Sequence, residues 1–472
     1  MKKIYLAWEW IDTKNYLDVV YPYNWEVFDQ VSLAWESEIN LAIEKAEIWF
    51  EKTKKLSPYE RQEILKFIIE ELKKQKEEFA KLLVLENWKT IKEARGEMER
   101  CISVFEIAVW ETTRIYWEYS DLAVNSMSLW RHSLVKLFPI WIVSWIVPFN
   151  FPMNLAAHKI APALAVCCPI IIKPASSTPL SMLKFAEIIE KSGWPKEAFS
   201  VVPATREDWQ ILVEDDRIKL LSFTGSPHVG WKMKNESWKK KVVLELGWNA
   251  WVIIDKNYEN IDWLIDRLVI WWFYQAGQSC ISVQKIFIHE DSYEFIKDKL
   301  VEKLKTLKVW DPMKEETFIW WIIDEKNRAR LWKWIDEAIE SWATCPIWNK
   351  WEWTILEPTL LENVWDSENI SKEEAFWPVA VLYKFSSIDE AIGMVNNSKF
   401  WLQVWIFSKN IDTIWKVFDE VEVWWVIQND VPSFRVDSMP YWWLKDSWLW
   451  REWVKYAMKD MLEEKVLVLK PE

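Results

Sequence analysis

The sequence predicts an α/β protein of two lobes, each built on a largely parallel sheet with helices on both faces. Short apolar runs alternate with amphipathic segments along most of the 472 residues, which is typical of such a sheet. A second alternating series begins near Val252 and runs through residues 292–307, 326–341 and 388–396. The chain is long enough for two or three domains and shows no internal repeat or low-complexity linker.

Capping residues and hydrophobic spacing place the expected elements of the first lobe. Ser57 and Glu60 form a capping box with Pro58 at the first helical position, and apolar residues follow at helical spacing. Apolar runs then alternate with amphipathic segments. The expected strands are residues 140–147, 169–173, 199–202, 220–223 and 242–246, and the expected helices between them are residues 180–192 and 208–214.

The most apolar region, residues 138–172, resembles a membrane span only in its composition. Five prolines interrupt it, and it carries Asn150, His158 and Lys159. A spanning helix needs about 20 uninterrupted apolar residues, so we expect buried strands and loops here. The N-terminus has no long apolar run before Glu9, and no signal peptide is predicted.

Charge and cysteine usage restrict the partner and the compartment. The formal charge is −13 and the basic residues are scattered, which argues against nucleic acid as a partner. Five cysteines without regular spacing fit a reducing compartment better than a disulfide framework. We therefore expect a cytoplasmic protein with no membrane association.

The composition contains 41 Trp against 7 Gly, whereas about 7% Gly is usual. In Asn24-Trp25 and Asn87-Trp88, Trp follows Asn where Asn-Gly is the usual turn dipeptide. We infer that most of these tryptophans are glycine in the biological protein, through a UGA codon that the source reads as glycine.

Adjacent tryptophan pairs support the inference of misread glycines, whereas a few single tryptophans fit a genuine indole. Trp271-Trp272, Trp424-Trp425 and Trp442-Trp443 are adjacent pairs that a core would rarely bury. Trp10 and Trp231, in contrast, lie in apolar contexts that suit a genuine indole. The alternative is a truly tryptophan-rich chain, in which many turns would be overpacked.

Two residues have side-chain types and settings that suit catalysis. Cys280 lies in the polar loop QAGQSCIS, where a thiol is accessible and its thiolate can accept hydrogen bonds. From the residues alone, a packed core cysteine is an equally good interpretation, as it is for Cys167-Cys168 in its apolar segment. Glu245 ends an apolar run, so it is either paired with a cation or has a raised pKa, as a general base requires.

Six motifs occur in order along the chain: PFNFP, KPAS, FTGSxxxG, LELGxN, GQSC and EAFWP. Together they resemble the aldehyde dehydrogenase superfamily over essentially the whole chain. The family has glycine at several positions where this sequence has tryptophan, namely Trp248, Trp377, Trp442, Trp443, Trp448, Trp450 and Trp453. The resemblance therefore supports the inference that these tryptophans are misread glycines.

The resemblance implies an aldehyde dehydrogenase-like α/β fold of three parts. A Rossmann-type cofactor domain would comprise residues 1–116 and 139–247, and an α/β catalytic domain residues 248–450. A small β oligomerisation arm, residues 117–138 and 451–472, would join the chain into a homodimer or homotetramer. Cys167 departs from the family pattern, which usually has glycine or alanine near this position.

The resemblance also implies NAD(P)-dependent oxidation of a small aldehyde to a carboxylic acid. Cys280 would attack the aldehyde carbon as a thiolate, and Asn150 with the Cys280 N–H would hold the oxyanion. After hydride transfer to the nicotinamide, Glu245 would activate water to hydrolyse the Cys280 thioester. No metal is implied.

The family's cofactor residues can be carried over by motif. Lys173 and Glu374 would meet the two ribose units, Ser226 the pyrophosphate at a helix N-terminus, and Phe376 the nicotinamide ribose. Taken alone, Lys173 could equally be a lysine that extends its ammonium to solvent from a strand end. The full set of implied cofactor residues is Phe149, Lys173, Ser176, Gly225, Ser226, Glu374 and Phe376.

Ser176 predicts which cofactor is accepted. NAD-specific members commonly have a glutamate there, which would repel a 2′-phosphate, whereas serine would not and Lys173 nearby could attract it. We therefore expect NADP to be accepted alongside NAD, and even preferred.

The substrate is expected to be a small aldehyde of the kind used by lactaldehyde, semialdehyde and non-phosphorylating glyceraldehyde-3-phosphate dehydrogenases, which the loop SFRVDSMPY resembles. Arg435 in that loop either meets an anionic or hydroxylated substrate or pairs with Asp437. Two alternative functions are a CoA-acylating semialdehyde dehydrogenase, which usually lacks a base such as Glu245, and a non-catalytic family member.

Overall fold

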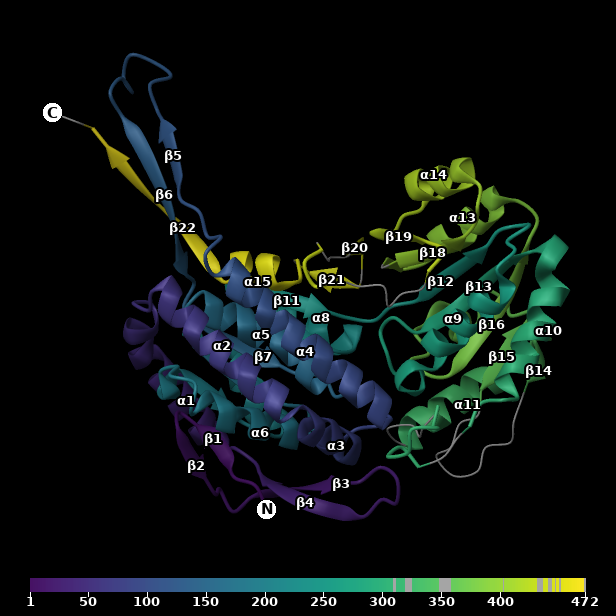
Figure 1. Ribbon diagram of the computed structural model, residues 1–472, viewed down its shortest axis with the longest axis horizontal. Helices are drawn as coiled ribbons and strands as arrows, with labels where there is room; N and C mark the ends of the chain where they lie inside the picture. The colour runs from purple at the N-terminus through teal and green to yellow at the C-terminus, as the bar shows by residue number, and fades with distance from the viewer. Residues whose placement is uncertain are drawn as a thin grey trace.

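The computed structural model describes residues 1–308, 311–318, 325–347, 358–401, 403–430, 436–439, 444–445, 447–449 and 451–470. Within these residues the chain forms two α/β lobes that lie side by side, and a β arm projects from the first lobe (Figure 1). This architecture confirms the predicted fold class. No helix in the described part of the chain is both long and apolar enough to cross a bilayer.

The first lobe contains an eight-stranded sheet whose five central strands are parallel. In spatial order the strands are β2 (Glu9–Ile11), β1 (Ile4–Leu6), β9 (Phe199–Val201), β8 (Ile170–Lys173), β7 (Ile142–Ile146), β10 (Ile218–Thr224), β11 (Lys241–Glu245) and β21 (Trp448–Leu449). Because the carboxyl ends of parallel strands meet at one edge, Lys173 at the end of β8 and Glu245 at the end of β11 lie along the same edge.

The second lobe contains a seven-stranded sheet that is parallel except for its edge strand β14. In spatial order the strands are β14 (Thr344–Ile347), β15 (Thr359–Glu362), β16 (Val379–Phe385), β13 (Val283–His289), β12 (Ala250–Ile254), β18 (Gln403–Phe407) and β19 (Trp425–Gln428). The loop with Cys280 directly precedes β13 at the centre of this sheet.

Helices cover both sheets (Figure 1). Those of the first lobe are α1 (Glu36–Thr53), α2 (Pro58–Lys74), α3 (Lys76–Glu86), α4 (Ile91–Glu111), α5 (Pro152–Ala165), α6 (Leu180–Ile189), α7 (Arg206–Glu214), α8 (Pro227–Glu236) and α15 (Val454–Asp460). Those of the second lobe are α9 (Ile261–Phe273), α10 (Tyr293–Leu304), α11 (Glu325–Glu340), α12 (Asn369–Lys372), α13 (Ile388–Asn396) and α14 (Ile411–Glu420).

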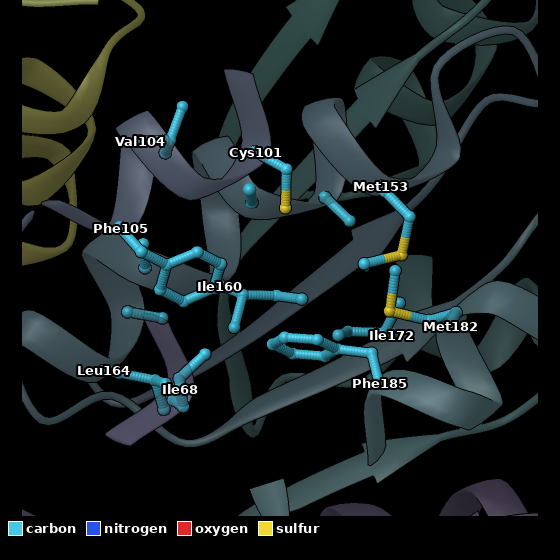
Figure 2. Packing of buried hydrophobic residues seen from close by; sticks show 14 of the residues in the cluster. Ile68, Cys101, Val104, Phe105, Met153, Ile160, Leu164, Ile172, Met182 and Phe185 are labelled. Carbon is cyan, nitrogen blue, oxygen red and sulfur yellow. The ribbon is translucent and has the colours of Figure 1, made fainter. Parts of the chain in front are cut away.

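Helix α5 lies at the centre of the first lobe's core. Figure 2 shows Ile160 of α5 among Phe105 of α4, Phe185 of α6 and Ile172 of β8, and all four side chains are buried. Since α5 follows the loop with Asn150, this close packing fixes the helix that begins beside that residue.

The projecting arm is a three-stranded antiparallel sheet of β5 (Glu118–Asp121), β6 (His132–Pro139) and β22 (Leu462–Leu469). Strand β22 pairs with β6 along its full length, from Leu462 opposite Pro139 to Leu469 opposite His132. Two short sheets complete the fold: β3 (Tyr16–Val20) with β4 (Val27–Ser32), and β17 (Phe400–Trp401) with β20 (Leu444–Lys445).

The expected elements are present, and their ends differ from the prediction by a few residues. Residues 388–396, a segment of the second alternating series, form a helix with the same bounds, and the predicted capping box at Ser57 is formed. The prediction of only strands and loops in residues 138–172 was wrong, because residues 152–165 form α5. Nearly all side chains of α5 are buried, so its sequence has no polar face to reveal a helical period.

The structure agrees with some of the expectations for individual tryptophans and contradicts others. Trp25 has a positive φ of 61°, as the predicted turn requires. Trp88 does not, and Asn87 is extended at φ −132°, so the expectation of an Asn-Gly-like turn there was wrong. The expectation that adjacent pairs escape burial was also wrong for Trp272, which is fully buried. Trp442-Trp443 lies outside the described residues.

Candidate active site

The loop that carries Cys280 has an unusual backbone. Gln275 and Ala276 have left-handed φ values of 56° and 53°, and Gly277 follows with φ 72°. A Cβ atom on Gly277 would lie 2.3 Å from the carbonyl carbon of Trp377, so only glycine allows this close approach. The loop of Cys280 therefore packs directly against the EAFWP motif.

Cys280 differs from three other cysteines in its accessibility. It is partly exposed, whereas Cys101, Cys167 and Cys168 are buried. Burial raises the pKa of each of those three thiols, which keeps them protonated and unreactive. The interpretation of Cys167-Cys168 as packed cysteines agrees with this placement, whereas Cys280 lies in the loop that forms the GQSC motif.

Asn150 joins the two lobes at this loop. It lies between β7 and α5 and is 5% exposed. Its side-chain Nδ2 donates to the backbone carbonyl of Gln278 at 3.1 Å, and its Oδ1 accepts the Phe151 N–H at 3.2 Å. The amide of Asn150, which is the predicted oxyanion donor, therefore contacts a residue that lies two positions before Cys280.

Glu245 is buried at the end of β11 and faces a buried cation. Its Oε1 lies 3.6 Å from Nζ of Lys159. The Lys159 ammonium also pairs with Glu452, which lies just before the start of α15. Burial lowers the pKa of Lys159, although the nearby Glu245 and Asp460 carboxylates oppose that change. An amine between two carboxylates can pass a proton from one to the other.

Sequence reasoning missed the roles of Lys159 and Glu452 in this cluster. Lys159 stood out only as a charge that argued against a membrane span. A lysine within an otherwise apolar segment is a signal in itself, because a buried ammonium needs a carboxylate partner. Of the two alternatives for Glu245, the structure supplies the cation partner, and a neighbouring cation favours the ionised form of a carboxylate, which is the form that accepts a proton.

Lys173 and Glu374 are two ionisable side chains whose polar atoms the described residues leave incompletely satisfied. The Lys173 ammonium makes no hydrogen bond or ion pair with any residue that the structure describes, and burial lowers its pKa to about 8. Glu374 accepts the Trp248 N–H, but its buried Oε1 has no hydrogen-bond partner among the described residues. Burial raises the pKa of Glu374 to about 8. Both groups fit a ligand that bears hydroxyl groups.

Aromatic side chains from the two lobes meet near these charges. The rings of Phe149 and Phe376 are 6.2 Å apart in a T-shaped arrangement, and Phe376 has a positive φ of 59°. A Cβ on Gly247 would lie 2.9 Å from Glu374 Oε2, so the LELGxN motif also packs against the EAFWP motif. Four of the quoted motifs therefore converge: PFNFP, LELGxN, GQSC and EAFWP.

The remaining predicted cofactor residues lie on loops at the carboxyl edge of the first sheet. Ser226 is the N-cap residue of α8, as predicted, and its side chain is exposed. Gly225 donates its N–H to the Glu245 carbonyl at 2.8 Å, and a Cβ there would lie 2.5 Å from the Phe223 ring. Ser176 is exposed in the turn after β8.

Arg435 lies outside the described residues, whereas residues 436–439, which follow it, are described. Asp437 is buried, and its Oδ1 lies 3.6 Å from Nη2 of Arg100 and 3.8 Å from Nε2 of His158. Arg100 projects from α4 and is about one-third exposed. Sequence reasoning did not single out Arg100.

Two α/β lobes meet at an accessible cysteine, a buried carboxylate and two incompletely satisfied ionisable groups, an arrangement that suits an α/β oxidoreductase. The chain belongs to the aldehyde dehydrogenase family, whose model matches residues 10–467. It is accordingly an aldehyde oxidoreductase that uses NAD or NADP.

Similar proteins cover the whole chain. A 3-sulfolactaldehyde dehydrogenase of Priestia aryabhattai is 36% identical over 469 residues, which is 99% of this chain and 97% of that protein. Aldehyde dehydrogenase 21 from Physcomitrella patens, solved in complex with the reaction product succinate, has a TM-score of 0.97 and 42% identity, covering 99% of this chain and 98% of its own. Glyceraldehyde-3-phosphate dehydrogenase from Methanocaldococcus jannaschii, complexed with NADP, has a TM-score of 0.91 and 32% identity, covering 96% and 99%.

Replacement of Glu374 by Gln should stabilise the ligand-free protein more at pH 8 than at pH 5. The ordinary pKa of 4.5 rises to about 8 in the folded state, so between these values only the unfolded chain ionises and stability falls as the pH rises. Gln cannot ionise, so its advantage in the free energy of unfolding should grow by about 3–4 kcal/mol across this range. Urea unfolding at both pH values measures it.

The control is Glu302→Gln, which changes an exposed carboxylate on α10. It should leave the difference from the wild type the same at both pH values. Equal effects of Glu374→Gln at pH 5 and pH 8 would show that the carboxyl group titrates normally.

Proposed function

We propose that this chain oxidises a small aldehyde with an anionic or hydroxylated far end to the carboxylic acid, with Cys280 as the nucleophile. The observation that carries the proposal is the contact of the Asn150 amide with the loop of Cys280. Three similar proteins support the substrate class by what their names state: one acts on 3-sulfolactaldehyde, one yields succinate, and one takes glyceraldehyde 3-phosphate.

In the first half-reaction the Cys280 thiolate adds to the aldehyde carbon and forms a thiohemiacetal. The Asn150 Nδ2 and the Cys280 backbone N–H hold the resulting oxyanion, and one such donor is typically worth about 3–4 kcal/mol. A bound nicotinamide would supply the hydride acceptor, and Cys280 would then carry the acyl group as a thioester. Lys173 and Glu374 would hold the ribose hydroxyls, and Ser226 the pyrophosphate.

In the second half-reaction Glu245 removes a proton from the water that attacks the thioester, which releases the acid and the thiol. The buried Lys159 between Glu245 and Glu452 offers that proton a route away from the site.

Arg100 supports an anionic substrate. Its guanidinium is about one-third exposed beside Asp437, in the segment that follows Arg435. Arg435 and Arg100 would together present two cations to a carboxylate, sulfonate or phosphate group. The pairing of Arg435 with Asp437 stays an alternative, although Asp437 already has Arg100 and His158 as neighbours.

Glu245→Gln should separate the two half-reactions. We expect its steady-state rate to fall about 100-fold or more, while mixing with aldehyde and NADP still gives a burst of one reduced cofactor per site. Stopped-flow absorbance measures both, and Cys280→Ser should show neither burst nor turnover. A normal steady-state rate would remove Glu245 from this role. Recovery of turnover by added CoA, with acyl-CoA as product, would favour the CoA-acylating alternative.

Ser176 should determine the acceptance of NADP. We expect Ser176→Glu to lower kcat/KM for NADP by about tenfold or more with little change for NAD, because the new carboxylate repels the 2′-phosphate. Ser120→Glu makes the same charge change on the distant arm and serves as the control. Strong discrimination against NADP by the unaltered chain would contradict the proposal.

We also propose that most tryptophans of this sequence are glycine in the protein that its source makes. Among the described residues, seven of the sixteen non-glycine residues with positive φ are Trp, namely Trp8, Trp25, Trp130, Trp141, Trp238, Trp342 and Trp453. Such φ values favour glycine. Eight buried indole N–H groups also lack a hydrogen-bond partner within the described residues, and each costs about 1–3 kcal/mol.

We further propose that the arm of β5, β6 and β22 joins two or four copies of the chain, which act in the cytoplasm. Apolar residues from Val466 to Leu469 are 44–56% exposed on β22. A cleft of about 590 Å³ between α4, α15 and the arm lies at its base. All five cysteines are free, as suits a reducing compartment. The division into residues 1–116 with 139–247, 248–450, and 117–138 with 451–472 stays a prediction.

Mass spectrometry of the protein purified from its source tests both proposals. Under denaturing conditions, peptide masses should give glycine at most of the 41 tryptophan positions. Under native conditions, the assembly should weigh two or four chains, because the exposed apolar strand is then covered. Intact tryptophans throughout would end the first proposal, and a monomer at micromolar concentration would end the second.

A further inference from the structure

Residues 87–97, which connect α3 to α4 and form the first turns of α4, contact both loops of the active site. Asn87 donates through Nδ2 to the Phe149 carbonyl at 2.7 Å and accepts from Gln275 Nε2 at 3.0 Å. Glu93 accepts the Gln275 N–H at 2.6 Å. The 87–97 segment therefore binds the Asn150 loop on one side and the Cys280 loop on the other.

Lys89 and Glu97 form an ion pair inside this segment, and both side chains are fully buried. The Lys89 ammonium also donates to the backbone carbonyl of Asn150 at 2.8 Å. Glu97 Oε1 accepts the N–H groups of Met153 and Asn154 at 2.8 and 3.1 Å, in the first turn of α5. The two charges thus hold the backbone of Asn150 and of the helix that follows it.

A buried ion pair contributes little to net stability, because desolvation offsets the Coulomb attraction. An apolar pair of similar size would fill the same space. Only a donor at Lys89 and an acceptor at Glu97 can satisfy the Asn150 carbonyl and the free N–H groups at the start of α5. The contacts of this pair therefore point to a role in geometry.

We propose that Lys89 and Glu97 are positioning residues that hold the Asn150 amide against the Cys280 loop. The proposal rests on the function proposed above, in which Asn150 stabilises the oxyanion. A displacement of about 1 Å at a positioned group costs up to about 100-fold in rate. Removal of the pair should therefore lower the rate through Asn150, even though neither residue touches the substrate.

The test is a double-mutant cycle on the full chain. Lys89→Met with Glu97→Gln removes both charges together, and the carbonyl of the new glutamine side chain can still accept the N–H groups of α5. We expect kcat for aldehyde oxidation to fall by about tenfold or more, with the Kd for NADPH within about twofold of the wild type. In an Asn150→Ala background, the same double change should lower kcat by less than about twofold.

The matched control is Lys76→Met with Glu99→Gln, which removes an exposed ion pair between α3 and α4. It should leave kcat unchanged in both backgrounds. An equal loss of kcat in the wild-type and Asn150→Ala backgrounds would show a general structural role and overturn the proposal, as would an unchanged kcat. An inactive wild type would instead refute the proposed function.

Asn87→Ala provides a second variant in case the double variant does not fold, because it removes a neutral side chain of the same segment. It should show the same dependence on Asn150, with a loss of at least about fivefold in the wild-type background. A loss that is independent of Asn150 would count against the proposal here too.

Discussion

The contact of the Asn150 amide with the Gln278 carbonyl crosses from the first lobe to the second, and the proposed active site depends on it. Neither lobe contains the whole proposed site: Asn150, Lys173 and Glu245 belong to the first sheet and its loops, whereas Cys280 and Glu374 belong to the second. The relative placement of the lobes therefore has to be accurate to about an ångström for a donor to reach an oxyanion.

Buried charges provide much of that accuracy. Lys159 lies among carboxylates, Lys89 and Glu97 hold the backbone around Asn150, and Lys173 and Glu374 lack full satisfaction within the described protein. Burial alone makes each of them unfavourable. Pairing offsets that cost within the protein, whereas in the proposed function the unsatisfied groups would gain their partners when the cofactor binds. The proposed site would thus be organised in advance and completed by its cofactor.

The fold could be predicted from the sequence where local patterns differ between strand and helix. The alternation of apolar runs predicted the two parallel sheets, and the Ser57 capping box predicted the start of α2. Helix α5 escaped prediction because it is buried on every side and contains Pro162. Its sequence has no polar face that would reveal a helical period. Packing among α4, α6 and β8 decides its helical state.

The sequence by itself determined the family and the thiol, carboxylate and amide side chains of the proposed site. It could do so because six motifs of the family occur in order along one chain. Only the tertiary structure decided which charges meet: Lys159 with Glu245 and Glu452, and Lys89 with the Asn150 carbonyl 61 residues away. Spacing along a chain reports neighbours on one element, whereas these partners lie on separate helices, loops and strand ends. Their meeting depends on the order of strands in the sheet and on the packing of helices over it.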